Sequence, residues 1–325
     1  METYYWRQFN KNNVSLIEYQ KPYRSPSDLA DKLISQGLHL HDRSYAERVI
    51  YLNNYFRIKA YFIPFMDSNK QFIAGTTFSD VYDLYTADQN IRVFLFQIVA
   101  HLEVRIRAVI DNVVTSVTND PFWHLNKKNF NKYDEVETAI KKAGSRFNIG
   151  KQEFVLHYRE RYFTTKSFEH RRIPPFWIIS EVFTLEQLLA VAKNIDRDRF
   201  RLPGDNKLNA CATQFGFAGY DALVTNLQCI LELRNICAHH SRLWNKNLRA
   251  PSSIAKKMKV KPGRYVKPNR LYTHLVMLRI MCKAQNMDDG ICDFFNHLIS
   301  NHAILAQDMN SMGFPAAWKT DPLWV

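Results

Sequence analysis

A run of apolar residues between positions 91 and 113 restricts the fold of this chain more than any other feature. Hydrophobic side chains recur there every three or four positions, as Ile91, Leu95, Ile98, Leu102, Ile106, Val109 and Val113. That spacing places them on one face of an α-helix, and the face must be buried against other elements. Strand-like alternation is not sustained anywhere, and Gly and Pro are sparse, at 10 and 12 residues. The sequence therefore predicts an all-α fold.

Capping and helix-breaking residues delimit the other helices. Two helices are expected within 21–65, separated at Gly37, and the second should end at Pro64. Further helices are predicted at 176–195, at 220–243 and within 270–308. The tail should pack on the body through three bulky side chains, Phe314, Trp318 and Trp324.

We divide the chain into an N-terminal helical region, 1–75, and a larger helical domain, 76–325. The larger domain contains a basic insert at 126–172, expected as exposed helices, and a basic loop at 245–270. Together these two segments carry more positive charge than the whole chain's net +13.

This charge predicts a polyanionic partner. The loop at 245–270 has nine Lys or Arg residues and no acid, and its prolines exclude the amphipathic helix that a membrane surface would bind. We therefore expect RNA, held by a flexible loop, and no membrane. The residues expected to bind it are Arg242, Lys246, Arg249, Lys256, Lys257, Lys259, Lys261, Arg264, Lys267 and Arg270, with Tyr265 stacking on a base.

No apolar h-region or membrane-length apolar segment is visible, and the five cysteines form no CxxC pair. These features predict a cytoplasmic protein with reduced thiols.

The stretch ELRNICAHHSRLWN, residues 232–245, holds the candidate chemistry. The apolar stripe of its helix runs into Arg234, and Asn235, Ala238, His239 and Arg242 share one side by helical spacing. Two arginines can bind a phosphodiester while His239 moves the proton of a ribose 2′-OH. Metal-independent RNA cleavage by 2′-OH attack is one interpretation. The other is structural, with Arg234 in a salt bridge to Glu103.

Other chemistries are less well supported. The chain has no phosphate-binding loop, HExxH or GxSxG motif. Cys237 fits buried core better than a nucleophile, and the His239–His240 pair lacks further zinc ligands. Glu103 lies beside the apolar face of its helix, with Arg92 and Arg105 on other faces, and it is too isolated from Asp111 for a two-metal site. We predict no metal and no cofactor.

The segment RNICAHH resembles the Arg–x4–6–His motif of HEPN ribonucleases, and LRNICAHHSRLWN is similar to their Abi (abortive infection, AbiD/AbiF-like) branch. Blocks such as NNYFRIKAYFIPF, HLEVRIRAVI and PPFWIISEVFTLEQL occur in the same order. The resemblance implies a HEPN-like helical bundle, phage-defence or toxin-like activity, and a homodimer in which two motif copies form one site. It also implies catalytic roles for Arg234, Asn235, His239 and His240, with Glu103 orienting the motif.

Three functions follow from these patterns. The first is a metal-independent endoribonuclease of phage defence. The second is a non-catalytic RNA-binding defence module, in which the same groove holds a small regulatory RNA. The third is a helical protein-interaction module whose charge serves solubility.

Overall fold

The computed structural model describes residues 18–163, 172–202, 205–258 and 267–324. Across these residues the fold is helical, apart from one antiparallel pair of two-residue strands, β1 (Arg201–Leu202) and β2 (Asp205–Asn206). The predicted all-α class is therefore confirmed. Within the same residues, no helix combines the length and the apolar character needed to cross a bilayer.

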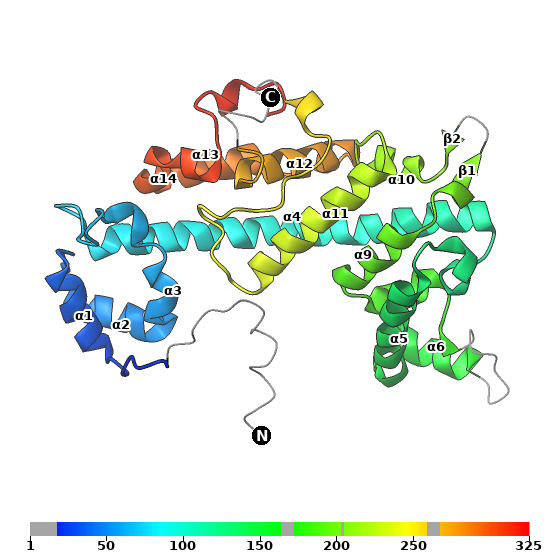
Figure 1. Ribbon diagram of the computed structural model, residues 1–325, viewed down its shortest axis with the longest axis horizontal. Helices are drawn as coiled ribbons and strands as arrows, with labels where there is room; N and C mark the ends of the chain where they lie inside the picture. The colour runs from blue at the N-terminus through cyan, green and yellow to red at the C-terminus, as the bar shows by residue number, and fades with distance from the viewer. Residues whose placement is uncertain (1–17, 164–171, 203–204, 259–266, 325) are drawn as a thin grey trace. The chain divides into compact units, whose positions relative to one another are not determined.

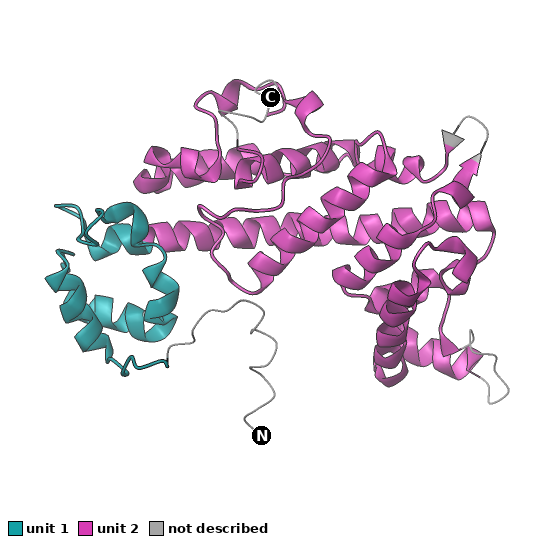
Figure 2. Ribbon diagram, viewed as in Figure 1, with its two compact units in different colours: residues 1–82 teal, residues 83–325 magenta. Residues whose placement is uncertain are grey.

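Two compact units make up the chain, residues 1–82 and 83–325, and Figure 2 colours them separately. They meet within the longest helix, α4 (Phe78–Thr118), whereas the domains drawn from the sequence meet at residue 75. Short 3-10 turns join the helices of both units. They are η1 (Ile63–Phe65), η2 (Trp123–Leu125), η3 (Lys127–Asn129), η4 (Ser180–Val182), η5 (Asp198–Phe200), η6 (Ala255–Lys257), η7 (Met309–Met312) and η8 (Trp318–Thr320).

The first unit contains α1 (Pro26–Ser35), α2 (Arg43–Asn53) and α3 (Tyr55–Lys59). Ser25 caps α1 in a capping box with Asp28, and Asp42 caps α2, as their positions in the sequence suggest. The second predicted helix is wrong in one respect, because it breaks at Asn54. That residue has a left-handed φ of 63°, and its side chain accepts a hydrogen bond from the N–H of Phe56 to start α3.

Helix α4 begins with a second capping box, between Thr77 and Asp80. The predicted apolar face is buried at Ile91, Leu95, Ile98, Leu102 and Ile106. Beyond Ile106 the buried positions become Ile110 and Val114 instead of Val109 and Val113. Arg92 was expected on another face, but it is only 3% exposed, because a buried carboxylate pairs with it.

The middle of the second unit contains α5 (Tyr133–Ile149), α6 (Glu153–Tyr162), α8 (Phe176–Ile179) and α9 (Leu185–Asn194). Helix α5 is basic yet amphipathic, and its apolar face packs on α9. The single helix predicted at 176–195 is wrong. It is interrupted at Thr184, whose hydroxyl caps α9 in a capping box with Gln187.

The remaining helices are α10 (Asn209–Gln214), α11 (Tyr220–Ala238), α12 (Leu271–Ala284), α13 (Ile291–Asn301) and α14 (Ala303–Gln307), shown in Figure 1. Helix α13 stacks Phe294 on Phe94 of α4, with ring centroids 3.9 Å apart. Arg105 of α4 donates to the carbonyl of Gln285, just after α12, at 2.9 Å. The tail packs down as predicted, with Phe314, Trp318 and Trp324 all buried.

The buried His124 gives the fold a specific pH dependence. Its ring lies against Trp123 and Phe176, and within the described residues neither ring nitrogen has a hydrogen-bond partner. Burial lowers its pKa from 6.5 to about 3. Below pH 6.5 the unfolded chain therefore binds a proton that the folded protein does not, so the free energy of unfolding should fall by about 1.4 kcal/mol per pH unit.

We expect His124→Leu to reduce the loss of stability between pH 6.5 and 4 by this amount. The measurement is urea unfolding of both proteins at several pH values. Identical slopes for the variant and the unchanged protein would contradict the expectation.

Candidate functional site

The helix that carries the candidate motif, α11, is deeply buried along the predicted stripe. Tyr220, Leu223, Leu227 and Ile230 are all nearly inaccessible, as expected. The stripe does not turn polar at Arg234, however. It continues through Leu233, Ile236 and Cys237, which are buried. Arg234 lies half-buried at the edge of this face, where its Nη1 donates to Oδ1 of Asn235 at 3.2 Å.

Helix α11 ends at Ala238, five residues before the predicted end at Leu243. His239 is the C-cap residue, and His240 has a left-handed φ of 53°. The N–H of His240 donates to the carbonyl of Cys237, and that of Ser241 donates to the carbonyl of Ile236, at 3.1 and 2.9 Å. This is a Schellman motif with histidine at the position where glycine is most common. Arg242 therefore lies beyond the helix and does not share its side with Asn235.

Asp88 of α4 holds the chain that follows this turn. Its carboxylate is fully buried, pairs with Arg92, and accepts the N–H groups of Leu243 and Trp244, the latter at 2.7 Å. Leu243 and Trp244 are themselves 1% exposed. A buried charge is tolerated only when it is paired and hydrogen-bonded, and Asp88 meets both conditions. The turn at His239 and His240 is therefore anchored from two sides, by α11 and by α4.

Neither Asp88 nor Arg92 was singled out in the sequence. A signal was available, because Asp88 is three residues before Ile91 and four after Leu84 and so continues the buried stripe of α4 towards its start. A carboxylate at a stripe position needs a buried partner. Its main-chain partners lie 155 and 156 residues away, however, and helical periodicity does not reveal them.

The turn presents its histidines to solvent. His239 and His240 are both exposed, and Asn235 precedes His239 by one helical turn. The guanidinium of Arg242 lies 5.9 Å from the ring centroid of Trp244, over the buried indole. The structure thus brings the predicted residues to one end of α11, although Arg242 reaches it from the following loop.

Glu103 is placed differently from the expectation. It is half-buried on α4 and pairs with Arg107 at 3.3 Å, and Arg107 also lies 3.6 Å from Glu181. In the described parts of the chain, Glu103 forms no ion pair with Arg234. The carboxylate of α4 that touches the motif segment is that of Asp88.

The basic segment, residues 245–270, is tied to α11 where it is described. Asn226 of α11 exchanges two hydrogen bonds with the main chain of Ser252, at 3.1 and 2.8 Å. Glu232 accepts the N–H of Arg249 at 2.8 Å. Leu248, Ile254 and Met258 are buried beneath it. The segment therefore runs back along α11 in a defined conformation, and the prediction of a flexible loop is wrong for these residues.

This anchoring leaves several predicted RNA-binding cations at the surface. Arg249, Lys256, Lys257 and Lys267 are exposed, and Lys246 is half-buried. Arg270 is less accessible, because its guanidinium donates to Oδ1 of Asn245 at 2.8 Å. Four other predicted residues lie outside the described parts of the chain, namely Lys259, Lys261, Arg264 and Tyr265.

A hollow of about 450 Å³ lies beside the motif and connects it to the segment. Asn235 and Glu232 of α11, Arg249 of the basic segment and Leu189 of α9 are among its lining residues. The motif residue Asn235 and the cation Arg249 thus face the same space.

Other nucleophile and acid candidates have structural roles. Burial raises the pKa of the Cys237 thiol to about 12, so a reactive thiolate is not populated at neutral pH. Asp111 accepts hydrogen bonds from Trp123 and Thr115, both at 2.9 Å, inside the core of the second unit. In the residues that the structure describes, no three His, Cys, Asp or Glu side chains are grouped to hold a metal ion.

Comparison with known proteins agrees with this arrangement. Residues 48–245 match the family model described as Abi-like protein, so the chain belongs to the Abi-like family. The match includes Asp88 and Arg92 and ends at Asn245, just after the histidine turn. No curated protein and no solved structure gives a significant match.

Replacing Asp88 with asparagine should strongly destabilise the protein. The change leaves Arg92 as a buried charge without its carboxylate and weakens the hold on Leu243 and Trp244, for a loss of about 3 kcal/mol of unfolding free energy. Asp83→Asn on the same helix is the control. Asp83 pairs with His302 while 40% exposed, so this change should cost less than about 1 kcal/mol. Equal losses in urea unfolding would refute the anchoring role of Asp88.

Proposed function

We propose that this protein is an RNA-binding phage-defence protein whose histidine turn after α11 cleaves RNA without a metal, as HEPN-type ribonucleases do. The observation that carries the proposal is the exposure of His239 and His240 at a turn that a buried carboxylate holds in place. Exposed, positioned imidazoles beside arginines are the groups that proton transfer at a phosphodiester requires.

Each residue has a role in this reaction. His239 acts as general base on the 2′-OH or as general acid on the departing 5′-oxygen. Attack of the 2′-oxygen forms a bond to phosphorus as the bond to the 5′-oxygen breaks, which leaves a 2′,3′-cyclic phosphate and a 5′-hydroxyl. Arg234 and Arg242 offset the charge that develops on the phosphate oxygens. Asn235 and His240 position the backbone.

The basic segment supplies the substrate channel. Because hydrogen bonds from Asn226 and Glu232 hold its main chain, Arg249, Lys256 and Lys257 are displayed along α11 without losing their own charge to acids of the helix. Such a row of cations binds a polynucleotide by releasing its counterions. RNA bound there would lead to Asn235, which shares a hollow with Arg249.

Two copies of the chain would complete the site. One His239 cannot serve as base and acid in the same step, and a two-fold axis near the turn would bring a second one. We therefore propose that a homodimer in the cytoplasm is the active form. Sedimentation equilibrium tests this point, since a monomer at concentrations that cleave RNA would exclude a shared site.

A specific observation also supports the alternative, a non-catalytic module that holds a small regulatory RNA. Within the described residues, no side chain forms a hydrogen bond with the His239 imidazole. A general base is commonly oriented by a second group. A histidine without one can contact an RNA backbone and yet transfer protons poorly.

Cleavage in the presence of EDTA separates the two functions. Purified protein should cut a single-stranded RNA in EDTA and leave its 2′-O-methyl analogue intact, because the attacking hydroxyl is blocked. His239→Ala should lower the rate at least about 100-fold, and His101→Ala, at another exposed histidine, should not change it. If RNA is bound but never cut at any protein concentration, the non-catalytic function is the correct one.

Neutralising two adjacent lysines tests the channel. Lys256 and Lys257 lie in the 3-10 turn η6 and are exposed. Their double change to glutamine should weaken RNA binding and lower the salt dependence by about 0.7 log units per lost phosphate contact on single strands. The control is Lys127→Gln with Lys128→Gln, an exposed pair in the matching turn η3. Equal effects of the two pairs would show that only overall charge matters.

A further inference from the structure

The first unit has an open groove of about 800 Å³ that is separate from the α11 turn. Its walls come from α1, α2, α3 and the segment before α1. Five aromatic rings line it, those of Tyr19, Tyr23, Tyr51, Tyr55 and Phe56. Four cations line it as well, Lys21, Arg24, Lys32 and Lys59, and none of its described lining residues is an acid.

The rings of the groove are unusually exposed. Tyr19, Tyr23, Tyr51 and Phe56 are between 76% and 87% exposed. The core of this unit does not need them, because other aromatic residues such as Tyr61 and Phe62 fill it and are nearly inaccessible. Large rings left in water next to one another indicate a surface that contacts a flat apolar partner.

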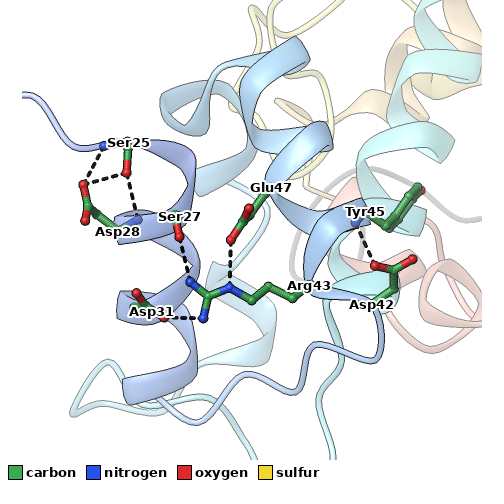
Figure 3. Close-up of polar contacts among 8 residues, drawn as sticks. All are labelled: Ser25, Ser27, Asp28, Asp31, Asp42, Arg43, Tyr45 and Glu47. Carbon is green, nitrogen blue, oxygen red and sulfur yellow. Dashed lines mark hydrogen bonds and ion pairs between the residues drawn. The ribbon is translucent and has the colours of Figure 1, made fainter.

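The acids near the groove are engaged elsewhere. Asp28 of α1 caps its own helix through Ser25, and Asp31 pairs with Arg43 of α2, as Figure 3 shows. Arg43 also binds Glu47 and Ser27. The carboxylates of α1 are thus compensated by a capping bond and by an arginine that does not line the groove, and the groove cations keep their positive field.

Lys32 reports this field. Its pKa is lowered, first by partial burial and then by repulsion from Lys59, Arg24 and Lys21. Its Nζ also lies 5.7 Å from the ring centroid of Tyr55. Cations that repel one another across a groove are stabilised when an anion enters between them.

We infer that this groove binds a single-stranded nucleic acid, with phosphates against Lys21, Arg24, Lys32 and Lys59 and bases stacked on the exposed rings. Alternating aromatic and cationic side chains fit a polynucleotide, which repeats a flat base and a phosphate along its length. An acidic peptide would match the charge but has no flat group at each step. A duplex would match the phosphates but keeps its bases stacked inside. The groove would be a second nucleic-acid site, and it does not rest on the proposed activity of the α11 turn.

Binding of short oligonucleotides to the full chain tests the groove. The probes are a labelled 2′-O-methyl oligouridylate of eight residues, which the proposed activity cannot cut, the corresponding oligothymidylate and a duplex of the same length. Tyr51→Leu with Phe56→Ala should weaken binding of the single strands about tenfold or more, as loss of base stacking does. Tyr51→Phe should retain affinity because it keeps the ring. The RNA and DNA probes show which sugar the site accepts.

Two controls make the result specific. Ile63→Ala removes an exposed apolar side chain of the same unit, 58% exposed and outside the groove, and should leave affinity unchanged. Polyglutamate at equal charge should compete weakly. Full competition by polyglutamate, equal affinity for the duplex, or no effect of the double variant would each overturn the inference.

Photo-crosslinking distinguishes this site from the basic segment. An oligonucleotide that contains 4-thiouridine should crosslink to Tyr19, Tyr23, Tyr51 or Phe56, and these crosslinks should persist in the Lys256→Gln, Lys257→Gln variant. Crosslinks confined to residues 246–270 would refute the groove and leave the proposed function standing. Crosslinks confined to the groove would support this inference and count against the proposed channel.

Discussion

The buried carboxylate of Asp88 is the interaction on which the candidate site depends. It lies within the apolar face of the long helix α4, where an unpaired charge would be costly. Arg92 supplies the opposite charge, and the N–H groups of Leu243 and Trp244 supply hydrogen bonds. One carboxylate therefore satisfies its own burial only by holding the chain just after the histidine turn. Exposed imidazoles gain a defined position because a charge several residues away is completely buried.

The same physical device recurs along α11, with weaker groups. Asn226, fully buried, and Glu232 bind the main chain of the basic segment, and three apolar side chains of that segment are buried beneath it. Main-chain anchoring leaves the Lys and Arg side chains at the surface, where they can meet phosphates instead of internal acids. The first unit reaches a similar result in another way, because Arg43 and a helix cap compensate its acids and the groove cations remain unopposed.

Much of the fold was predictable from local patterns. Ile91 to Ile106 are buried as their spacing requires, and the caps at Ser25 and Asp42 start helices where their side chains can accept main-chain hydrogen bonds. Errors arose where a local group competed with the pattern. Thr184 caps a new helix inside a continuous apolar run, and Asn54 adopts a left-handed conformation inside another. Both residues hydrogen-bond the main chain readily, which weakens a helix that periodicity alone would continue.

By itself, the sequence determined the all-α class, the buried stripes and the concentration of arginine, histidine and lysine around residues 232–270. These follow from spacing and composition, which are local properties. Only the tertiary structure decided where α11 ends, which carboxylate serves it and how the basic segment lies. His240 turns the chain in a left-handed conformation, and Leu243 and Trp244 then bond to a residue 155 and 156 positions earlier. Such pairing depends on which buried groups the folded chain brings together, and no local pattern encodes that choice.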